Sequence, residues 1–106
     1  MKIKLNQEIK NIDGVTPLYN IENDPTSGIM FAKNVCINAI LTPTQGDDEK
    51  IKFEKWEIFK KLRDCDDIVD LTIDQWGKIK SSIGKYYPQL ILGQMFEILE
   101  GKNENI

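Results

Sequence analysis

The sequence predicts a mainly α domain of the α+β class, in which four helices form a compact unit with a small N-terminal β-hairpin. The chain has 106 residues, of which 41% are hydrophobic and 29% charged, values that fit a single globular domain over residues 1–106. Residues 2–10 alternate between apolar and polar side chains, as half-buried strands do. From Gly28 onwards, apolar residues recur at helical spacing between recognisable helix start and stop signals.

The β-hairpin is predicted over residues 1–21. Its first strand alternates apolar residues with lysines, and Asp13 followed by Gly14 is a strong signal for a tight turn. The chain then returns as a second strand, whose proline restricts it to the edge of a sheet. Because a two-stranded hairpin is only marginally stable in water, we expect it to pack on the helices or to gain a third strand from residues 68–71.

The first helix is predicted over residues 28–41. It follows a stretch at 22–28 whose composition is that of a loop, and Thr26 or Ser27 could cap it. Its side chains are apolar almost all round, with one narrow polar stripe. A helix of this kind belongs at the centre of a core.

The second helix is predicted over residues 48–63. Acidic residues at its start suit the positive end of the helix dipole. One face is apolar and the opposite face carries balanced charges, so we expect that face to be solvated. Phe53 and Trp56 lie at the side of the apolar face. If they are exposed, they would be anchors of a protein interface.

The third and fourth helices are predicted over residues 73–86 and 88–100. A Thr-x-x-Gln capping box at 72–75 starts the third helix, and Pro88 separates the two. The fourth helix has few polar positions, so we expect it to be the most buried of the four. The polar residues 102–106 are expected to form a frayed tail.

Small residues form a stripe along the third helix. Gly77, Ser81 and Gly84 share one side of the helix, where glycine lowers helix stability. Two glycines on one side suggest that another backbone approaches closely. Internal helix packing would explain the stripe, and a docking groove for a partner is the alternative.

The stretch at residues 64–74 contains five acidic side chains and no basic one. An EF-hand calcium loop needs glycine at its sixth position, where this stretch has Val69, so the motif is not met. The composition indicates a solvated acidic loop. The alternative is an acidic surface, made by Asp66, Asp67 and Asp70, that meets a basic partner.

The composition excludes several chemistries. The chain has no histidine, which removes histidine-based nucleophile systems and histidine metal ligands. The two cysteines, Cys36 and Cys65, are too few for a structural zinc site. We therefore predict no catalytic residue, no metal and no cofactor. Both cysteines are predicted to be buried free thiols, and their geometry decides whether they form a disulfide.

Charge and hydropathy restrict the partners. A net charge of −3 argues against a dedicated nucleic-acid-binding protein, which usually carries a clear basic excess. No apolar stretch is long enough to span a membrane, and the chain does not begin with the apolar run of a signal peptide. We therefore expect a cytoplasmic protein without a membrane partner.

These observations favour a non-enzymatic protein–protein interaction module. The apolar surface of the second and fourth helices also predicts self-association as a homo-oligomer. One alternative is a nucleic-acid-associated regulator, in which three lysines would contact phosphates and two tyrosines would stack on bases. These residues are Lys78, Lys80, Lys85, Tyr86 and Tyr87. Another alternative is an enzyme whose acids and bases would be the carboxylates at 64–74, Lys85 and the tyrosines.

The chain also resembles small uncharacterised proteins, about a hundred residues long, that tailed bacteriophages and prophages encode. The similar features extend over nearly the whole chain and contain no catalytic signature. They are Asp13-Gly14 after the first strand, Asn38-Ala39-Ile40-Leu41, Val69-Asp70-Leu71-Thr72, Ile83-Gly84-Lys85-Tyr86-Tyr87-Pro88, Gly93-Gln94 and Leu99-Glu100. The resemblance implies a phage origin and a compact protein of the bacterial host cell, and it supplies no activity and no site residues. With that origin, the interaction module predicted above would be an adaptor, an assembly factor or a modulator of a host protein.

Overall fold

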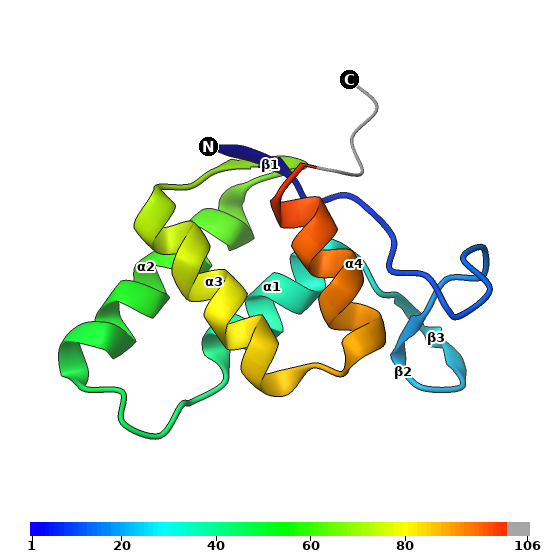
Figure 1. Ribbon diagram of the computed structural model, residues 1–106, viewed down its shortest axis with the longest axis horizontal. Coiled ribbons are helices and arrows are strands. Elements are labelled where there is room, and N and C mark those ends of the chain that lie inside the picture. Colours follow the sequence, from blue (N-terminus) through cyan, green and yellow to red (C-terminus); the bar gives the residue numbers. More distant parts are fainter. Residues whose placement is uncertain (102–106) are drawn as a thin grey trace.

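The computed structural model describes residues 1–101, which form four helices and two small antiparallel sheets (Figure 1). This arrangement confirms the predicted α+β fold class. The predicted tail at 102–106 lies outside the described residues. In chain order the elements are β1 (Lys2–Lys4), β2 (Tyr19–Ile21), β3 (Asp24–Ile29), α1 (Ala32–Leu41), α2 (Glu49–Asp64), β4 (Ile68–Asp70), α3 (Ile73–Tyr86) and α4 (Gln89–Leu99).

Helix α1 forms the centre of the core, as its apolar surface predicts. It packs against α2, α3 and α4, and five of its ten residues are buried. The expectation that α4 is the most buried helix is wrong, since α4 buries only Met95, Ile98 and Leu99. The first turn of α4 instead points its apolar side chains towards the β2–β3 hairpin, where they stay partly exposed.

Strand β1 pairs with β4, which is distant in sequence. The antiparallel register places Ile3 opposite Val69, and both side chains enter the core. The expected strand at 68–71 is thereby confirmed. Residues 2–4 do not pair with residues 15–21 as predicted, because β4 has the same alternation of buried and exposed residues and can cover β1 directly. The predicted hairpin pairing is present at its turn end, where Lys10 bridges to Pro17.

The chain does reverse direction at Asp13 and Gly14, as predicted. The Asp13 carboxylate accepts hydrogen bonds from the Thr16 hydroxyl and from the amides of Val15 and Thr16, and these bonds hold the pKa of Asp13 below its usual value. Gly14 has a φ of 73°, which favours glycine. An antiparallel bridge between Lys10 and Pro17 closes this turn.

The returning segment pairs with β3 and forms the β2–β3 hairpin. Residues 22–28 were expected to be a loop, but they form a turn, in which Asn23 has a φ of 62°, and most of β3. Their turn-forming composition is explained by this tight turn and by the irregular strand pairing next to it. Thr26 and Ser27 bond within the hairpin, so α1 begins four residues later than predicted, at Ala32.

The ends of the other helices follow their local signals. Thr72 and Gln75 form the predicted capping box, with both bonds at 3.1 Å, and α3 spans the predicted residues. The Asp48 carboxylate caps α2 by accepting from the Ile51 amide at 2.8 Å. Pro88 precedes α4, so the boundaries of these three helices agree with prediction to within one residue.

Both cysteines are free thiols, and the structure contains no bond between them. Cys36 lies in α1, where burial raises the pKa of its thiol to about 12. Cys65, expected to be buried, is half-exposed just after α2, and its thiol donates to the Leu62 carbonyl oxygen at 3.2 Å.

We expect one thiol of the native protein to react readily with Ellman's reagent at mildly alkaline pH. That thiol is Cys65, because Cys36 is inaccessible and stays protonated. The second thiol should react only after unfolding in guanidinium chloride. Fast reaction of both thiols in the native protein would contradict the burial of Cys36, and a Cys65→Ser variant identifies the reactive group.

Candidate functional site

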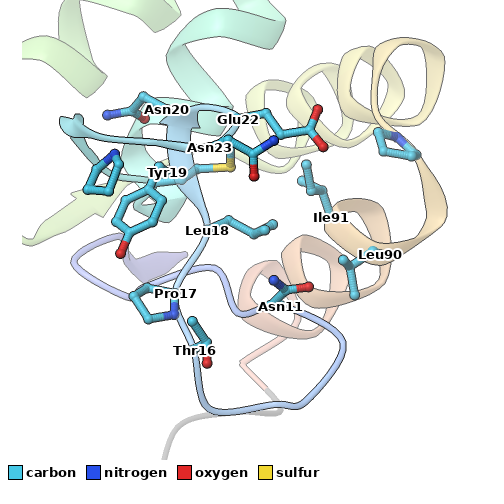
Figure 2. Close-up of a pocket in the computed structure, with 13 residues that line it drawn as sticks. Asn11, Thr16, Pro17, Leu18, Tyr19, Asn20, Glu22, Asn23, Leu90 and Ile91 are labelled. Atoms are coloured by element: carbon cyan, nitrogen blue, oxygen red, sulfur yellow. The ribbon is translucent and has the colours of Figure 1, made fainter.

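A hollow with a volume of about 680 Å³ lies between the β2–β3 hairpin and the start of α4 (Figure 2). We call it the hairpin groove. Its apolar lining consists of Pro17, Leu18, Tyr19, Pro25, Met30, Pro88, Leu90 and Ile91. Its polar lining consists of Asn11, Thr16, Asn20, Glu22 and Asn23. The volume lies within the range of small-molecule sites.

Backbone hydrogen bonds hold the hairpin side of the groove. The Ile9 amide donates to the Met30 carbonyl oxygen, the Met30 amide to that of Leu18, and the Leu18 amide to that of Ile9, at 2.8–2.9 Å. This closed set of three bonds ties the segment before the Asp13 turn to both sides of the hairpin. Leu18 and Met30, which line the groove, are therefore fixed by their own main chain.

Gln94 joins the hairpin side to the helix side. Its side-chain amide accepts from the Lys10 amide at 2.7 Å and donates to the Lys10 carbonyl oxygen at 2.8 Å, as a neighbouring strand would. Because Gln94 lies one turn after Leu90 in α4, this pair of bonds sets the distance between the two walls. Hydrogen bonds thus connect the two walls of the groove.

The chemistry of the groove suits binding. In Figure 2, Leu18 lies between Tyr19 and the two residues that project from α4, Leu90 and Ile91. Among the described residues that line the groove, Glu22 alone carries a charge. A single carboxylate is not the carboxylate pair of a glycosidase-like site. The groove offers apolar contacts, side-chain amides and one negative charge.

Phe53 and Trp56 meet the condition stated for interface anchors, because 61% and 46% of their surfaces are exposed. They lie on α2, at the opposite end of the molecule from the β2–β3 hairpin (Figure 1). The structure therefore does not bring them together with the hairpin groove. They belong to a separate surface.

A second, smaller hollow of about 320 Å³ lies between α2 and α3, beside Phe53. Lys78 lies in this hollow and bonds to Asp74 at 2.5 Å and to Glu54 at 3.0 Å. These two carboxylates raise the pKa of the Lys78 ammonium, which keeps the lysine charged and paired. Such a lysine is unsuited to act as a base or nucleophile near neutral pH.

The small-residue stripe faces solvent. Gly77, Ser81 and Gly84 are all exposed, and a side chain added at Gly77 would meet open space. The interpretation of the stripe as internal helix packing is therefore wrong. The apolar face of α3 that enters the core is the adjacent one, which carries Ile79 and Ile83.

Two of the three candidate acidic residues hold the N-terminal strand. The Asp67 carboxylate accepts from the Asn6 amide at 3.1 Å, and the Asp70 carboxylate pairs with the amino group of Met1 at 3.2 Å. Asp66 is exposed. Within residues 1–101, no group of three potential ligand side chains could hold a metal ion.

The lysines and tyrosines of the nucleic-acid hypothesis make contacts within the protein. The Lys80 ammonium lies 4.3 Å from the Trp76 ring centre and bonds to Glu100 at 2.9 Å. Tyr86 donates to the Pro43 carbonyl oxygen at 2.6 Å, while Tyr87 is half-buried. With Lys78 also paired, only Lys85 of this set is exposed without a hydrogen bond or ion pair within the described part of the chain. The set forms no continuous basic and aromatic surface.

Sequence reasoning missed the hairpin groove. The available signal was the run Leu90-Ile91-Leu92, which gives the start of α4 more apolar surface than a core contact needs. That signal predicts exposed apolar residues but not what lies opposite them. The opposite wall depends on the position of the β2–β3 hairpin, which Gln94 and the set of three backbone bonds determine.

Comparison with known proteins found no matching family model, no matching curated protein and no matching solved structure. The resemblance to phage-encoded proteins therefore stays a prediction. Over residues 1–101, no helix combines the length and the apolar character needed to cross a membrane.

Proposed function

We propose that this chain is a non-enzymatic protein–protein interaction module and that its hairpin groove receives a segment of a partner protein. The observation that supports this most is the groove itself, with a volume of about 680 Å³ and an apolar lining edged by amide side chains. Leu90, at 38% exposure, leaves apolar surface in the groove that a partner would cover. Following the resemblance, we further propose a phage-encoded adaptor or modulator in the bacterial cytoplasm.

The lining indicates the chemistry of the partner segment. Apolar side chains would fill the space between Leu18 and Ile91, where burial removes their surface from water. Asparagine amides both donate and accept, so Asn11 and Asn23 could pair with the exposed main chain of an extended segment. Glu22 favours a lysine or arginine next to the apolar side chains.

Selection from a library of random linear peptides, followed by affinity measurement, tests this proposal. We expect the selected peptides to share adjacent apolar residues with a basic residue beside them. Leu90→Gln should weaken their binding about tenfold or more, because a buried apolar contact is lost. Glu22→Gln should weaken binding by a smaller factor that decreases as salt is added.

Ile73→Gln is the matched control. Ile73 is an exposed apolar residue in the first turn of α3, as Leu90 is in the first turn of α4, and it lies outside the groove. Both changes remove an exposed apolar side chain without altering charge. Equal effects of Leu90→Gln and Ile73→Gln on affinity, or a failure to select any binding peptide, would refute the groove as the partner site.

A further inference from the structure

Helix α2 carries a second exposed surface, which runs along its whole length. We call this surface the α2 seam and define it by Glu49, Phe53, Trp56, Lys60 and Arg63. Their spacings of four, three, four and three residues are those of the contact positions in paired helices. Ile58 and Leu62 enter the core, and the helical repeat turns the seam to the opposite side.

The centre of the seam is apolar and uncovered. Phe53 and Trp56 are 61% and 46% exposed, and α2 forms one end of the molecule in Figure 1. The ring of Trp56 packs against that of Phe59 with 5.2 Å between centroids, which orients it in the absence of a partner. Aromatic side chains of this kind supply most of the binding energy in protein interfaces.

The charges of the seam change sign along the helix. Glu49 lies in the first turn, whereas Lys60 and Arg63 lie near the end. Among the described residues, no ion pair involves Glu49. Lys60 pairs with Glu57 of its own helix, at 3.1 Å, in an exposed contact that a new partner could replace.

This pattern is complementary to itself in one orientation only. If two α2 helices lie antiparallel so that Phe53 of one faces Trp56 of the other, the same register places Glu49 opposite Lys60. Both contacts then occur twice, related by the two-fold axis. In a parallel pair, Glu49 would face Glu49 and Lys60 would face Lys60, which is repulsive.

We propose that two copies of this chain associate through antiparallel α2 seams, with two Phe53–Trp56 contacts at the centre and two Glu49–Lys60 contacts at the sides. This surface is at the opposite end of the molecule from the hairpin groove. The dimer therefore leaves both grooves open, and its existence does not depend on the function proposed for them.

Sedimentation equilibrium over a concentration series, at low salt, tests the proposal. The unaltered chain should form a dimer. Glu49→Lys and Lys60→Glu should each raise the dimer dissociation constant about tenfold, since each change turns both attractive contacts into repulsive ones. An equimolar mixture of the two variants should dimerise as the unaltered chain does, because each reversed charge then faces its opposite.

The mixture separates a seam contact from a folding defect, because a misfolded variant would not regain association when mixed. Phe53→Ala should weaken the dimer both in the unaltered chain and in the mixture of charge variants. Ile21→Ala is the control and should not weaken it, because Ile21 is an equally exposed apolar residue of β2, outside the seam. A monomer at all concentrations would overturn the proposal. The proposal would also be overturned if the charge reversals left the dimer dissociation constant unchanged, or if the mixture of the two variants stayed monomeric.

Discussion

Leu5→Ala is expected to lower the free energy of unfolding by about 2–5 kcal/mol, the range for large-to-small changes at fully buried positions. Leu5 is completely buried in the core shared with the helices. Its amide donates to the Asp67 carbonyl oxygen at 2.7 Å, and its carbonyl oxygen accepts from the Lys33 amide at 3.2 Å. A domain of this size has a total stability of about 5–15 kcal/mol, so the loss should be large.

Urea denaturation monitored by circular dichroism measures this effect. Ile12→Ala is the control, because Ile12 is exposed next to the Asp13 turn and its loss should change stability by no more than about 0.5 kcal/mol. A small effect of Leu5→Ala would indicate that the N-terminal strand contributes little to the core. A large effect supports its pairing with β4 within the core.

Trp76→Ala is expected to lower the free energy of unfolding by about 3–5 kcal/mol. The indole of Trp76 packs on the core and donates to the Leu99 carbonyl oxygen at 2.9 Å, which joins α3 to the end of α4. Its ring also supports the Lys80 ammonium, whose distance to the Phe96 ring centre is 4.7 Å. The alanine variant loses the packing, the hydrogen bond to Leu99 and the contact between the Trp76 ring and the Lys80 ammonium.

Trp76→Phe separates these contributions. Phenylalanine keeps an aromatic ring for packing and for Lys80 but cannot donate to Leu99, so we expect a smaller loss, of about 1–2 kcal/mol. The same denaturation measurement compares the two variants. If Trp76→Phe were as destabilising as Trp76→Ala, the hydrogen bond to α4 would dominate and the packing account would be wrong.

The parts of the fold that depend on local signals are predictable from the sequence. Helix α3 has the predicted bounds because Thr72, Gln75 and Pro88 determine its ends within a few residues. The pairing of β1 with β4 was not predicted as the main arrangement of the N-terminal strand. It joins segments more than sixty residues apart, and alternation alone identifies a strand without naming its neighbour.

The candidate sites divide in the same way. The helical pattern places Phe53 and Trp56 at the side of the apolar face but does not determine whether they are exposed. The structure shows that both are exposed. The hairpin groove depends on the long-range contact between Gln94 and Lys10. No pattern in the sequence specifies that contact, so the groove could not be predicted. Asn-Asp-Pro-Thr-Ser-Gly at 23–28 has the composition of a loop, although most of it forms β3.

The two surfaces give the protein a simple organisation. The α2 seam would join two copies at one end of each molecule, and the hairpin groove would stay available at the other. A dimer with two grooves can bind two segments of the same partner assembly, which raises the overall affinity without any new contact.

Amide NMR spectra of the isotope-labelled protein, recorded while a selected peptide is added, test the central claim most directly. If the hairpin groove receives the partner segment, the resonances that shift should come from residues 16–25 and 88–91, and those of α2 should stay in place. Shifts confined to α2, or spread over the molecule without a maximum at the groove, would contradict the account.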